Sequence, residues 1–329
     1  MTNTDAKTLL AREMAARFPQ SVECDVPLSR ISRWRVGGRA DVLVRPTSIE
    51  ELRSLRAWLH GRGVRHLVIG STTNLLFADA GLRTVCIQIG ARMGAIAVNA
   101  QEVRAGAGAW VPGLARRVMQ AGLTGAEHIC GIPGTLGGLI CMNGGSQRKG
   151  IGTALVDLVA VAPSGDLVRF DQPACGFAYR NSIFQNNDLI VAEARLRFDR
   201  ALDRRVVRRE MLEILSSRRH RFPQKQPNCG SVFKSNPAMY AEIGPPGSAI
   251  EQLGFKGHRV GGALVSPQHA NFIVNAGNAT AAEVLALIAK IADAVERETG
   301  YRMEAEAKYV TPDGRFMPAD CALQLQKRK

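Results

Sequence analysis

The sequence predicts an α+β protein in which strand-rich segments with glycine turns precede a more helical C-terminal part. Its 329 residues are enough for two or three domains. Hydrophobic residues make up 46% and charged residues 22%, which is typical of a globular chain with an ordinary core. The 33 glycines fall in clusters, and such clusters indicate tight turns close to a ligand.

The first predicted part, residues 1–76, contains a strand, a helix and a second strand. Short apolar runs at 42–44 and 64–69 predict the two strands. Between them, Ser48 and Glu51 have the spacing of a capping box, so a helix is expected to begin there. Together these elements predict a small βαβ-like unit.

The second predicted part, residues 77–200, is rich in short strands separated by glycine turns. The turn residues at 163–166 predict a hairpin, and one helix is expected over 111–120, ending at Gly122. This pattern favours an antiparallel or mixed sheet with helices packed on it. The expected strands lie at 84–89, 95–98, 102–105, 156–162 and 167–170.

The third predicted part, residues 201–329, opens with a basic helix. It closes with a helix that begins at a capping box of Thr280 and Glu283 and ends at Gly300. The tail after Val310 shows no pattern that predicts an element.

Net charge is +14, which raises the question of a nucleic-acid partner. The arginines are spread along the chain without a zinc-finger, RRM or KH signature, so we expect none. The densest cluster lies on the basic helix, where it forms either a solvated face or an electrostatic funnel for an anionic substrate. It consists of Arg204, Arg205, Arg208, Arg209, Arg218, Arg219 and Arg221.

The seven cysteines form no CxxC pair and are odd in number, so we expect reduced thiols and no metal site. No run of 18 apolar residues is present, and the N-terminus lacks the apolar core of a signal peptide. The sequence therefore predicts a cytoplasmic protein without membrane insertion.

Two segments, of which the second is rich in glycine, are candidates for holding a phosphorylated ligand. Residues 69–76 follow a strand and are small and polar, so their backbone N–H groups either cradle a diphosphate or form an ordinary turn. Residues 131–138 contain four glycines and lead to a further Gly pair at 144–145. They permit close backbone approach to a flat ligand, or else form a structural turn, and they lack the GxGxxG fingerprint.

Three further positions carry groups that suit catalysis. Arg180 beside Tyr179 suits bidentate binding of a carboxylate, although a surface arginine looks the same in sequence. Ser231 follows a glycine, so it is either an accessible proton donor or a turn residue. Glu304 and Glu306 share one face of an alternating segment, which is either catalytic or solvated.

Taken in order, these segments resemble the UDP-N-acetylenolpyruvoylglucosamine reductase (MurB) family. The resemblance covers roughly residues 25–310, and the short connection over 183–189 is similar to the subclass without a long substrate-covering loop. The matching stretches are residues 32–41, 131–138, 179–184, 230–234, 257–262, 269–275 and 304–310.

The resemblance implies a two-part FAD-binding domain of the vanillyl-alcohol-oxidase type, residues 1–76 and 77–200, and a C-terminal α+β substrate-binding domain with a tail, residues 201–329. It implies an NADPH-dependent flavoenzyme of peptidoglycan precursor synthesis that reduces the enolpyruvyl group of UDP-N-acetylglucosamine enolpyruvate. In that reaction Ser231 protonates the substrate carbon, while Arg180 and Glu306 stabilise or polarise its carboxylate.

The resemblance also assigns binding residues. We expect non-covalent FAD, because residues 69–76 contain no His or Cys, although His128 and Cys130 flank the second glycine segment. A monomer is expected. The cofactor-binding residues are Gly70, Ser71, Thr72, Thr73, Asn74, Gly131, Ile132, Pro133, Gly134, Thr135, Gly137 and Gly138; the substrate-binding residues are Tyr179, Arg219, Lys234, Asn236 and Arg259.

Several positions depart from the family pattern. Arg39 stands where the family has proline, Ser235 is an extra residue, and Ser248 stands where a lysine is common. These departures leave room for a divergent paralogue acting on a related nucleotide sugar, and two alternatives stay open. One is a flavin oxidoreductase of the same fold acting on a different nucleotide sugar or small substrate, and the other is a basic binding protein without catalysis.

Overall fold

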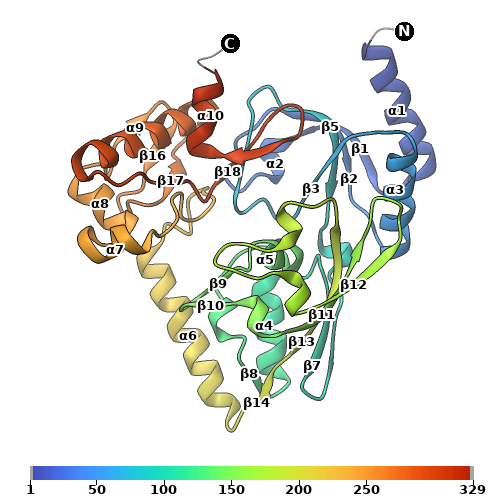
Figure 1. The fold of residues 1–329 in the computed structure, drawn as a ribbon, viewed down its shortest axis with the longest axis horizontal. Coiled ribbons are helices and arrows are strands. Elements are labelled where there is room, and N and C mark those ends of the chain that lie inside the picture. Colours follow the sequence, from blue (N-terminus) through green and yellow to red (C-terminus); the bar gives the residue numbers. More distant parts are fainter. Residues whose placement is uncertain (1–2, 327–329) are drawn as a thin grey trace. The chain divides into compact units, whose positions relative to one another are not determined.

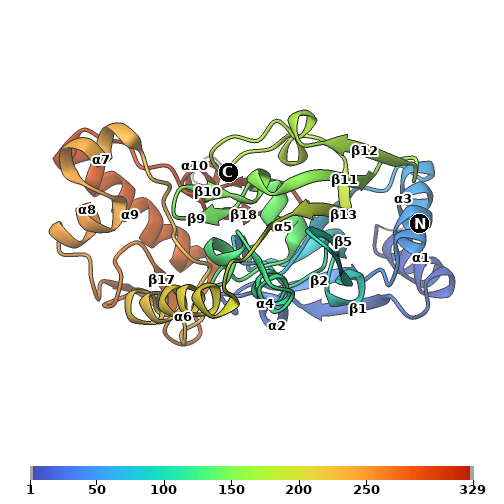
Figure 2. The ribbon, with the colours of Figure 1, turned by 90° about the horizontal axis from the view of Figure 1, so that it is seen from below.

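The computed structural model describes residues 3–326, which form two compact units (Figure 1 and Figure 2). Unit 1 contains the chain up to residue 23 with 43–71 and 85–218, and unit 2 contains 24–42, 72–84 and the chain from 219. The division into three parts predicted from sequence stays a prediction.

A four-stranded sheet has the order β1-β2-β5-β3. Strand β3 runs parallel to β5, with His66 opposite Val85. The helix α3 begins after Ser48, whose hydroxyl accepts from the Glu51 N–H at 3.1 Å. In a complete capping box the Glu51 carboxylate would accept from the N–H of the N-cap residue, Ser48. Here it accepts instead from the N–H of the preceding residue, Thr47. The bounds are β1 Val22–Pro27, β2 Arg39–Val44, α3 Ile49–Gly61, β3 His66–Ile69 and β5 Leu82–Gln88.

Unit 1 also contains a five-stranded antiparallel sheet of order β12-β11-β13-β7-β6. Its strands β6, β7, β11 and β12 lie within one residue of the expected positions, whereas β13 was not predicted from the sequence; α4 has the predicted bounds. Leu114 and Val118 are buried on α4, as its periodicity requires. The bounds are β6 Ile96–Asn99, β7 Glu102–Gly106, α4 Val111–Gln120, β11 Leu155–Val161, β12 Leu167–Asp171 and β13 Ile190–Arg197.

Smaller elements complete unit 1. They are α1 Asn3–Arg17, β8 Leu123–Thr124, α5 Leu136–Cys141, β9 Gly145–Ser146, β10 Lys149–Gly150 and β14 Asp199–Arg200. The basic helix forms as predicted, as α6 over Arg204–Arg221, and it buries Val207 and Met211 while most of its arginines are exposed.

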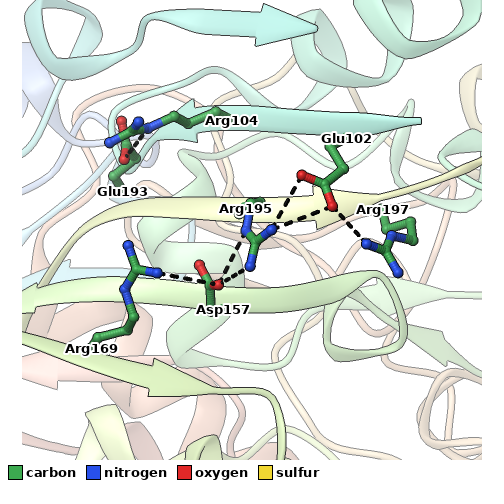
Figure 3. A network of polar contacts seen from close by, with 7 residues as sticks. All are labelled: Glu102, Arg104, Asp157, Arg169, Glu193, Arg195 and Arg197. Atoms are coloured by element: carbon green, nitrogen blue, oxygen red, sulfur yellow. Dashed lines mark hydrogen bonds and ion pairs between the residues drawn. The ribbon is translucent and has the colours of Figure 1, made fainter. Parts of the chain in front are cut away.

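One face of the five-stranded sheet carries a network of charges (Figure 3). Arg195 pairs with Asp157 and with Glu102, at 3.2 Å from the latter, and so joins three strands. The hydrogen bond from Arg195 lowers the pKa of Asp157. Exposed pairs of this kind contribute little individually, but opposite charges placed directly across strands favour this register. The other members are Arg104, Arg169, Glu193 and Arg197.

Up to residue 326, unit 2 holds two three-stranded sheets and four helices besides α2. In the sheet β19-β18-β4, strand β18 runs parallel to β4, and the sheet β15-β16-β17 is antiparallel. The bounds are α2 Leu28–Ile31, β4 Leu75–Phe77, α7 Pro237–Ile243, α8 Pro246–Gln252, β15 Arg259–Val260, β16 Ala263–Val265, β17 Ile273–Asn275, α9 Ala281–Thr299, β18 Lys308–Val310, β19 Phe316–Pro318 and α10 Ala319–Gln326.

The helix α9 organises the core of unit 2. Its predicted capping box of Thr280 and Glu283 is confirmed, and Gly300 ends it in the left-handed region. The Asp79 carboxylate adds a second cap by accepting from the N–H groups of the first two helical residues at 2.7 and 3.0 Å. Fully buried Trp34 donates its indole N–H to the Ile273 carbonyl at 2.7 Å, which fixes an early segment to the C-terminal part.

Within residues 3–326, no helix is long and apolar enough to cross a membrane. The same residues contain no cluster of His, Cys, Asp and Glu side chains that could hold a metal ion. The seven cysteines are all free.

Candidate active site

The two glycine-rich turns predicted to hold a cofactor meet in unit 1. Gly70 directly follows β3, and a Cβ placed on it would lie 2.3 Å from the Thr135 hydroxyl oxygen. Thr135 is itself buried and forms an isolated bridge with Trp110. A side chain at position 70 would force the Thr135 hydroxyl to move, so the backbone of the first turn lies directly against the second segment.

The second segment is held by backbone hydrogen bonds to the residues that precede α4. The Leu136 N–H donates to the Ala109 carbonyl at 2.8 Å, and the Gly137 N–H donates to Ala107 at 2.8 Å. Gly134 has a φ of 148°, which glycine tolerates and most residues do not. These contacts leave a side-chain-poor surface beside Gly70 of the kind that admits a diphosphate, so the residues fit the predicted FAD.

The candidates for a covalent flavin tether are both buried. His128 and Cys130 are almost inaccessible, and burial raises the pKa of the Cys130 thiol to about 11. Its Sγ lies 3.8 Å from the Met211 carbonyl, which accepts from it. A protonated, buried thiol is a poor nucleophile, which supports the expectation of non-covalent FAD.

The rest of the first turn belongs to unit 2. Thr72 is buried with a φ of 55°, and its hydroxyl donates to the Ile31 carbonyl at 2.8 Å and accepts from the Arg33 N–H. A non-glycine residue in the left-handed region costs free energy, and such residues cluster at functional sites. Asn74 donates its side-chain amide to the Glu306 carbonyl at 2.9 Å, which ties the turn to a predicted catalytic residue.

Arg180 sits in a tight two-residue turn of unit 1. Ala178 and Asn181 exchange backbone hydrogen bonds around it, and Arg180 has a φ of 53°. The Tyr179 ring is 64% exposed and its centre lies 5.5 Å from the Arg180 guanidinium carbon. Backbone hydrogen bonds therefore fix the turn that carries Tyr179 and Arg180.

Asn143, to which sequence reasoning gave no role, anchors that turn. Its amide donates to the Ala178 carbonyl at 3.0 Å, and its carbonyl oxygen accepts from the Gly152 N–H at 3.0 Å. The Ser182 hydroxyl also donates to the Cys141 carbonyl at 2.8 Å. Residues just after the glycine-rich segment therefore hold the Arg180 turn. An Asn before two glycines was the only sequence signal, and it is typical of any turn.

Ser231 and Glu306 lie on neighbouring extended segments of unit 2. The Glu306 N–H donates to the Val232 carbonyl at 2.7 Å, and Phe233 forms an antiparallel bridge with Ala305. The predicted alternation of buried and exposed side chains is confirmed. Ala305 and the residues on the same face of the segment are buried, whereas Glu304 on the other face is exposed. The structure thus brings together two of the three predicted catalytic residues within one unit.

Asn271 fixes this pair of segments and was also missed by sequence reasoning. It is buried, accepts from the Phe233 N–H at 2.9 Å and donates to the Phe233 carbonyl at 3.0 Å. Its own carbonyl accepts from the Val232 N–H. Three hydrogen bonds therefore determine the backbone that follows Ser231.

The predicted substrate-binding residues of unit 2 have varied surroundings. The Lys234 ammonium lies 3.3 Å from the Glu304 carboxylate. Asn236 is the N-cap of α7, accepting from the Ala238 N–H at 3.0 Å. Arg219 and Arg259 are exposed on α6 and β15. Lys234 and Asn236 thus have structural partners of their own.

The fold and the two glycine turns define an FAD-dependent oxidoreductase. Residues 40–171 match an FAD-binding domain, and residues 222–310 match the C-terminal domain of UDP-N-acetylenolpyruvoylglucosamine reductase. The chain belongs to the UDP-N-acetylenolpyruvoylglucosamine reductase family. The family, the α+β fold class and the FAD cofactor predicted from sequence are confirmed.

Relatives match over nearly the whole chain. UDP-N-acetylenolpyruvoylglucosamine reductase 1 of Corynebacterium glutamicum is 41% identical over 95% of this chain and 92% of its own length. The reductase of Halalkalibacterium halodurans is 36% identical over 92% and 98%. The crystal structure of the MurB reductase from Thermus caldophilus is 29% identical, covers 88% of this chain and 98% of its own, and superposes with a TM-score of 0.74.

Proposed function

We propose that this chain reduces the enolpyruvyl group of UDP-N-acetylglucosamine enolpyruvate to give UDP-N-acetylmuramate, with NADPH as the reductant, in peptidoglycan precursor synthesis. The observation that carries the proposal is the Ser231–Glu306 segment pair in unit 2, in a chain of this reductase family. Reduction of a carbon–carbon double bond adds a hydride to one carbon and a proton to the other. A positioned proton donor and a group that stabilises developing negative charge are both needed.

When bound, FAD supplies the hydride chemistry. The residues that hold it are the turn at 70–74 and the segment at 131–138, whose fit rests on the close approach of Gly70 to Thr135. Holding a diphosphate here requires backbone N–H groups that a ligand can approach closely, and Gly70 and the four glycines of 131–138 leave room for this approach.

Ser231 gives its hydroxyl proton to the substrate carbon next to the carboxylate. Three hydrogen bonds with Asn271, one donated and two accepted by it, hold the backbone that follows Ser231, so little ordering is needed at the moment of reaction. Arg180 pairs with the substrate carboxylate and stabilises the charge that develops on it, a task that suits a guanidinium. Glu306 polarises the same carboxylate, with its backbone tied to Asn74.

The remaining residues bind the rest of the substrate. The UDP-sugar is anionic, and Arg219, Lys234 and Arg259 supply positive charge, while Tyr179 and Asn236 supply an aromatic face and an amide. The net charge of +14 favours capture of both anionic substrates. The protein acts as a cytoplasmic monomer.

Ser231→Ala tests the proposal. The rate at which NADPH reduces the flavin should stay near normal, because this step needs no proton from Ser231. Reoxidation by the enolpyruvyl substrate should slow by roughly 10²-fold or more, the scale of losing a positioned general acid. Stopped-flow absorbance of the flavin measures both halves.

Two further variants sharpen the test. Ser231→Cys should recover part of the rate, since a thiol also donates a proton, and Ser235→Ala on the same segment should change neither half. Equal slowing of both halves by Ser231→Ala would remove the assigned role. A normal NADPH half-reaction with no turnover of this substrate by the unaltered protein would instead indicate a different nucleotide sugar.

A further inference from the structure

The turn that leads from β14 into α6 presents a fully exposed leucine. Leu202 is as exposed as in an extended chain (108%), and Val206 in the first turn of the helix is 56% exposed. Figure 1 shows this turn at the lower end of unit 1. One partly exposed apolar side chain needs no explanation, but a leucine whose whole surface faces water contributes nothing to the core.

The backbone on both sides of Leu202 is fixed. Before it, the Ala201 N–H donates to the Gly122 carbonyl at 2.9 Å. After it, the Asp203 carboxylate accepts from the Arg205 N–H at 2.7 Å and so caps the start of α6. The leucine is therefore exposed on a turn that hydrogen bonds define.

Arginines surround this leucine along the chain. Residues 200–209 contain five arginines and a single carboxylate, that of Asp203, and the stretch is flanked by Asp199 and Glu210. All five arginines are exposed, and within residues 3–326 none of them forms an ion pair with a carboxylate. The five are Arg200, Arg204, Arg205, Arg208 and Arg209. We call Leu202, Val206 and these five arginines the basic tip.

Arginines on the five-stranded sheet of the same unit have different surroundings (Figure 3). There Arg195 pairs with both Asp157 and Glu102. Arg104 pairs with Glu193 in the same way. Unit 1 thus compensates its sheet arginines with neighbouring carboxylates, whereas the basic tip keeps a concentrated positive charge.

Helix α6 does not need these arginines for its own stability. Arg204 and Arg205 lie in its first turn, where the helix dipole disfavours positive charge. The helix packs through Val207 and Met211, which are buried. Arg205 and Arg209, four residues apart, lie on the side of the helix away from this pair. Neither the charge nor the apolar exposure of the basic tip is therefore explained by folding.

We propose that the basic tip docks on the surface of a phospholipid bilayer that carries net negative charge. Lipid phosphates accept from the guanidinium groups, and the boundary between headgroups and acyl chains admits Leu202 and Val206. The backbone of a nucleic acid would satisfy the arginines but leave Leu202 in water, so the leucine favours the bilayer. This contact is peripheral and does not depend on which substrate the enzyme reduces.

Binding is tested by sedimentation of the FAD-loaded protein with lipid vesicles. The protein should sediment with vesicles of phosphatidylglycerol and phosphatidylcholine in equal parts, and not with vesicles of phosphatidylcholine alone. Raising the salt concentration to about 0.5 M should weaken the binding roughly tenfold or more, because the attraction between arginines and headgroups is screened.

The apolar part of the contact is tested at constant charge. Leu202→Ser should weaken binding to the anionic vesicles roughly tenfold, because the side chain that enters the headgroup boundary is lost. Leu167→Ser is the matched control, since Leu167 is a 47% exposed leucine on β12 of the same unit. It should change the binding by less than about twofold. Both variants should keep their full FAD content, which shows that they are folded.

The charged part is tested with two pairs of substitutions. Arg205→Gln together with Arg209→Gln should weaken the binding roughly tenfold or more. Arg30→Gln together with Arg297→Gln removes the same charge from exposed positions of unit 2 and should change the binding by less than about twofold. Equal losses in the two double variants would show that only the net charge matters and would overturn the proposal.

The location is tested by fluorescence. Leu202→Trp should add an emission that brominated phospholipids quench, over the background of the three native tryptophans, whereas Leu167→Trp should add none that is quenched. Failure to sediment with anionic vesicles, equal binding of neutral vesicles, or equal binding by Leu202→Ser and Leu167→Ser would overturn the proposal. So would tighter binding to a DNA duplex that Leu202→Ser leaves unchanged, which would indicate a nucleic-acid partner instead.

Discussion

The two units place their candidate residues by different physical means. In unit 1 the Gly70 turn, the 131–138 segment and the Arg180 turn depend on backbone conformation, with left-handed residues and positions where a Cβ does not fit. In unit 2 Ser231 and Glu306 lie on extended segments that are fixed by a buried side-chain amide, that of Asn271.

The difference indicates which kind of substitution each half tolerates. A site that depends on backbone conformation is sensitive to added side-chain volume and to loss of glycine, because other residues do not readily adopt the same backbone angles. A site held by a buried amide is sensitive to loss of that amide, because the groups it served are left without partners. Cofactor binding and proton donation should therefore be separable by mutation.

The largest effect on stability is expected from Asn271→Ala. It leaves the buried N–H and carbonyl of Phe233 without partners, which should lower the free energy of unfolding by about 2 to 4 kcal/mol. Chemical denaturation measures the change, and FAD content should stay high where the protein is folded. Gln252→Ala, an exposed amide, is the control and should change stability by less than about 0.5 kcal/mol. A loss as small as the control's would contradict the role of Asn271.

Gly70→Ala should act on the cofactor instead. The new Cβ meets the Thr135 hydroxyl at 2.3 Å, and overpacking of this kind costs about 1 to 3 kcal/mol, or roughly five- to hundredfold in FAD affinity. Flavin retention after dialysis measures it. Gly61→Ala, where a Cβ meets no neighbour within 4 Å, is the control.

Adding Thr135→Ala to Gly70→Ala should restore part of the binding, because the clashing hydroxyl is removed. Coupling between the two substitutions in a double-mutant cycle is the expected signature. Strict additivity would show that the two turns do not contact each other as described.

The smallest effect is a dependence of stability on pH. Burial is the main cause that lowers the pKa of His66 and His128 in unit 1 and of His269 in unit 2. The unfolded chain therefore binds more protons than the folded one below its histidine pKa of about 6.5, so stability should fall as pH decreases from there. Thermal unfolding between about pH 7.5 and about pH 5.5 measures the slope, which His128→Gln should reduce. Stability that rises on acidification would contradict the burial of these rings.

Much of the fold could be predicted from sequence because its signals are local. The helix α4 and the capping box of α9 follow from periodicity and capping residues that lie within a few positions of each other. The order β1-β2-β5-β3 could not be predicted, since pairing between distant strands leaves no local trace. The elements β19 and α10 were missed because α10 buries the small residues Ala319 and Ala322, which give a weak apolar pattern.

The site divides in the same way. Gly70 and the 131–138 segment could be found because several glycines together are a compositional signal. Asn143 and Asn271 could not be found, because an asparagine is typical of any turn, and the groups that Asn271 serves lie 38 residues away in the chain. Only the folded chain shows that both amides are hydrogen-bonded to distant backbone groups and that Asn271 is buried.

Unit 2 is assembled from chain segments that the ribosome makes far apart in time. Strand β4 pairs with β18, and Asn74 and Glu306, which are hydrogen-bonded, are 232 residues apart. At a synthesis rate of about 5 to 20 residues per second, the earlier segment waits roughly 10 to 50 seconds for its partner. During that interval Trp34 and Leu76, both fully buried in the finished protein, have no C-terminal core to enter. The nascent chain is therefore a natural client for chaperones that bind exposed apolar segments, and truncation of its last hundred residues should leave unit 2 unable to fold at all.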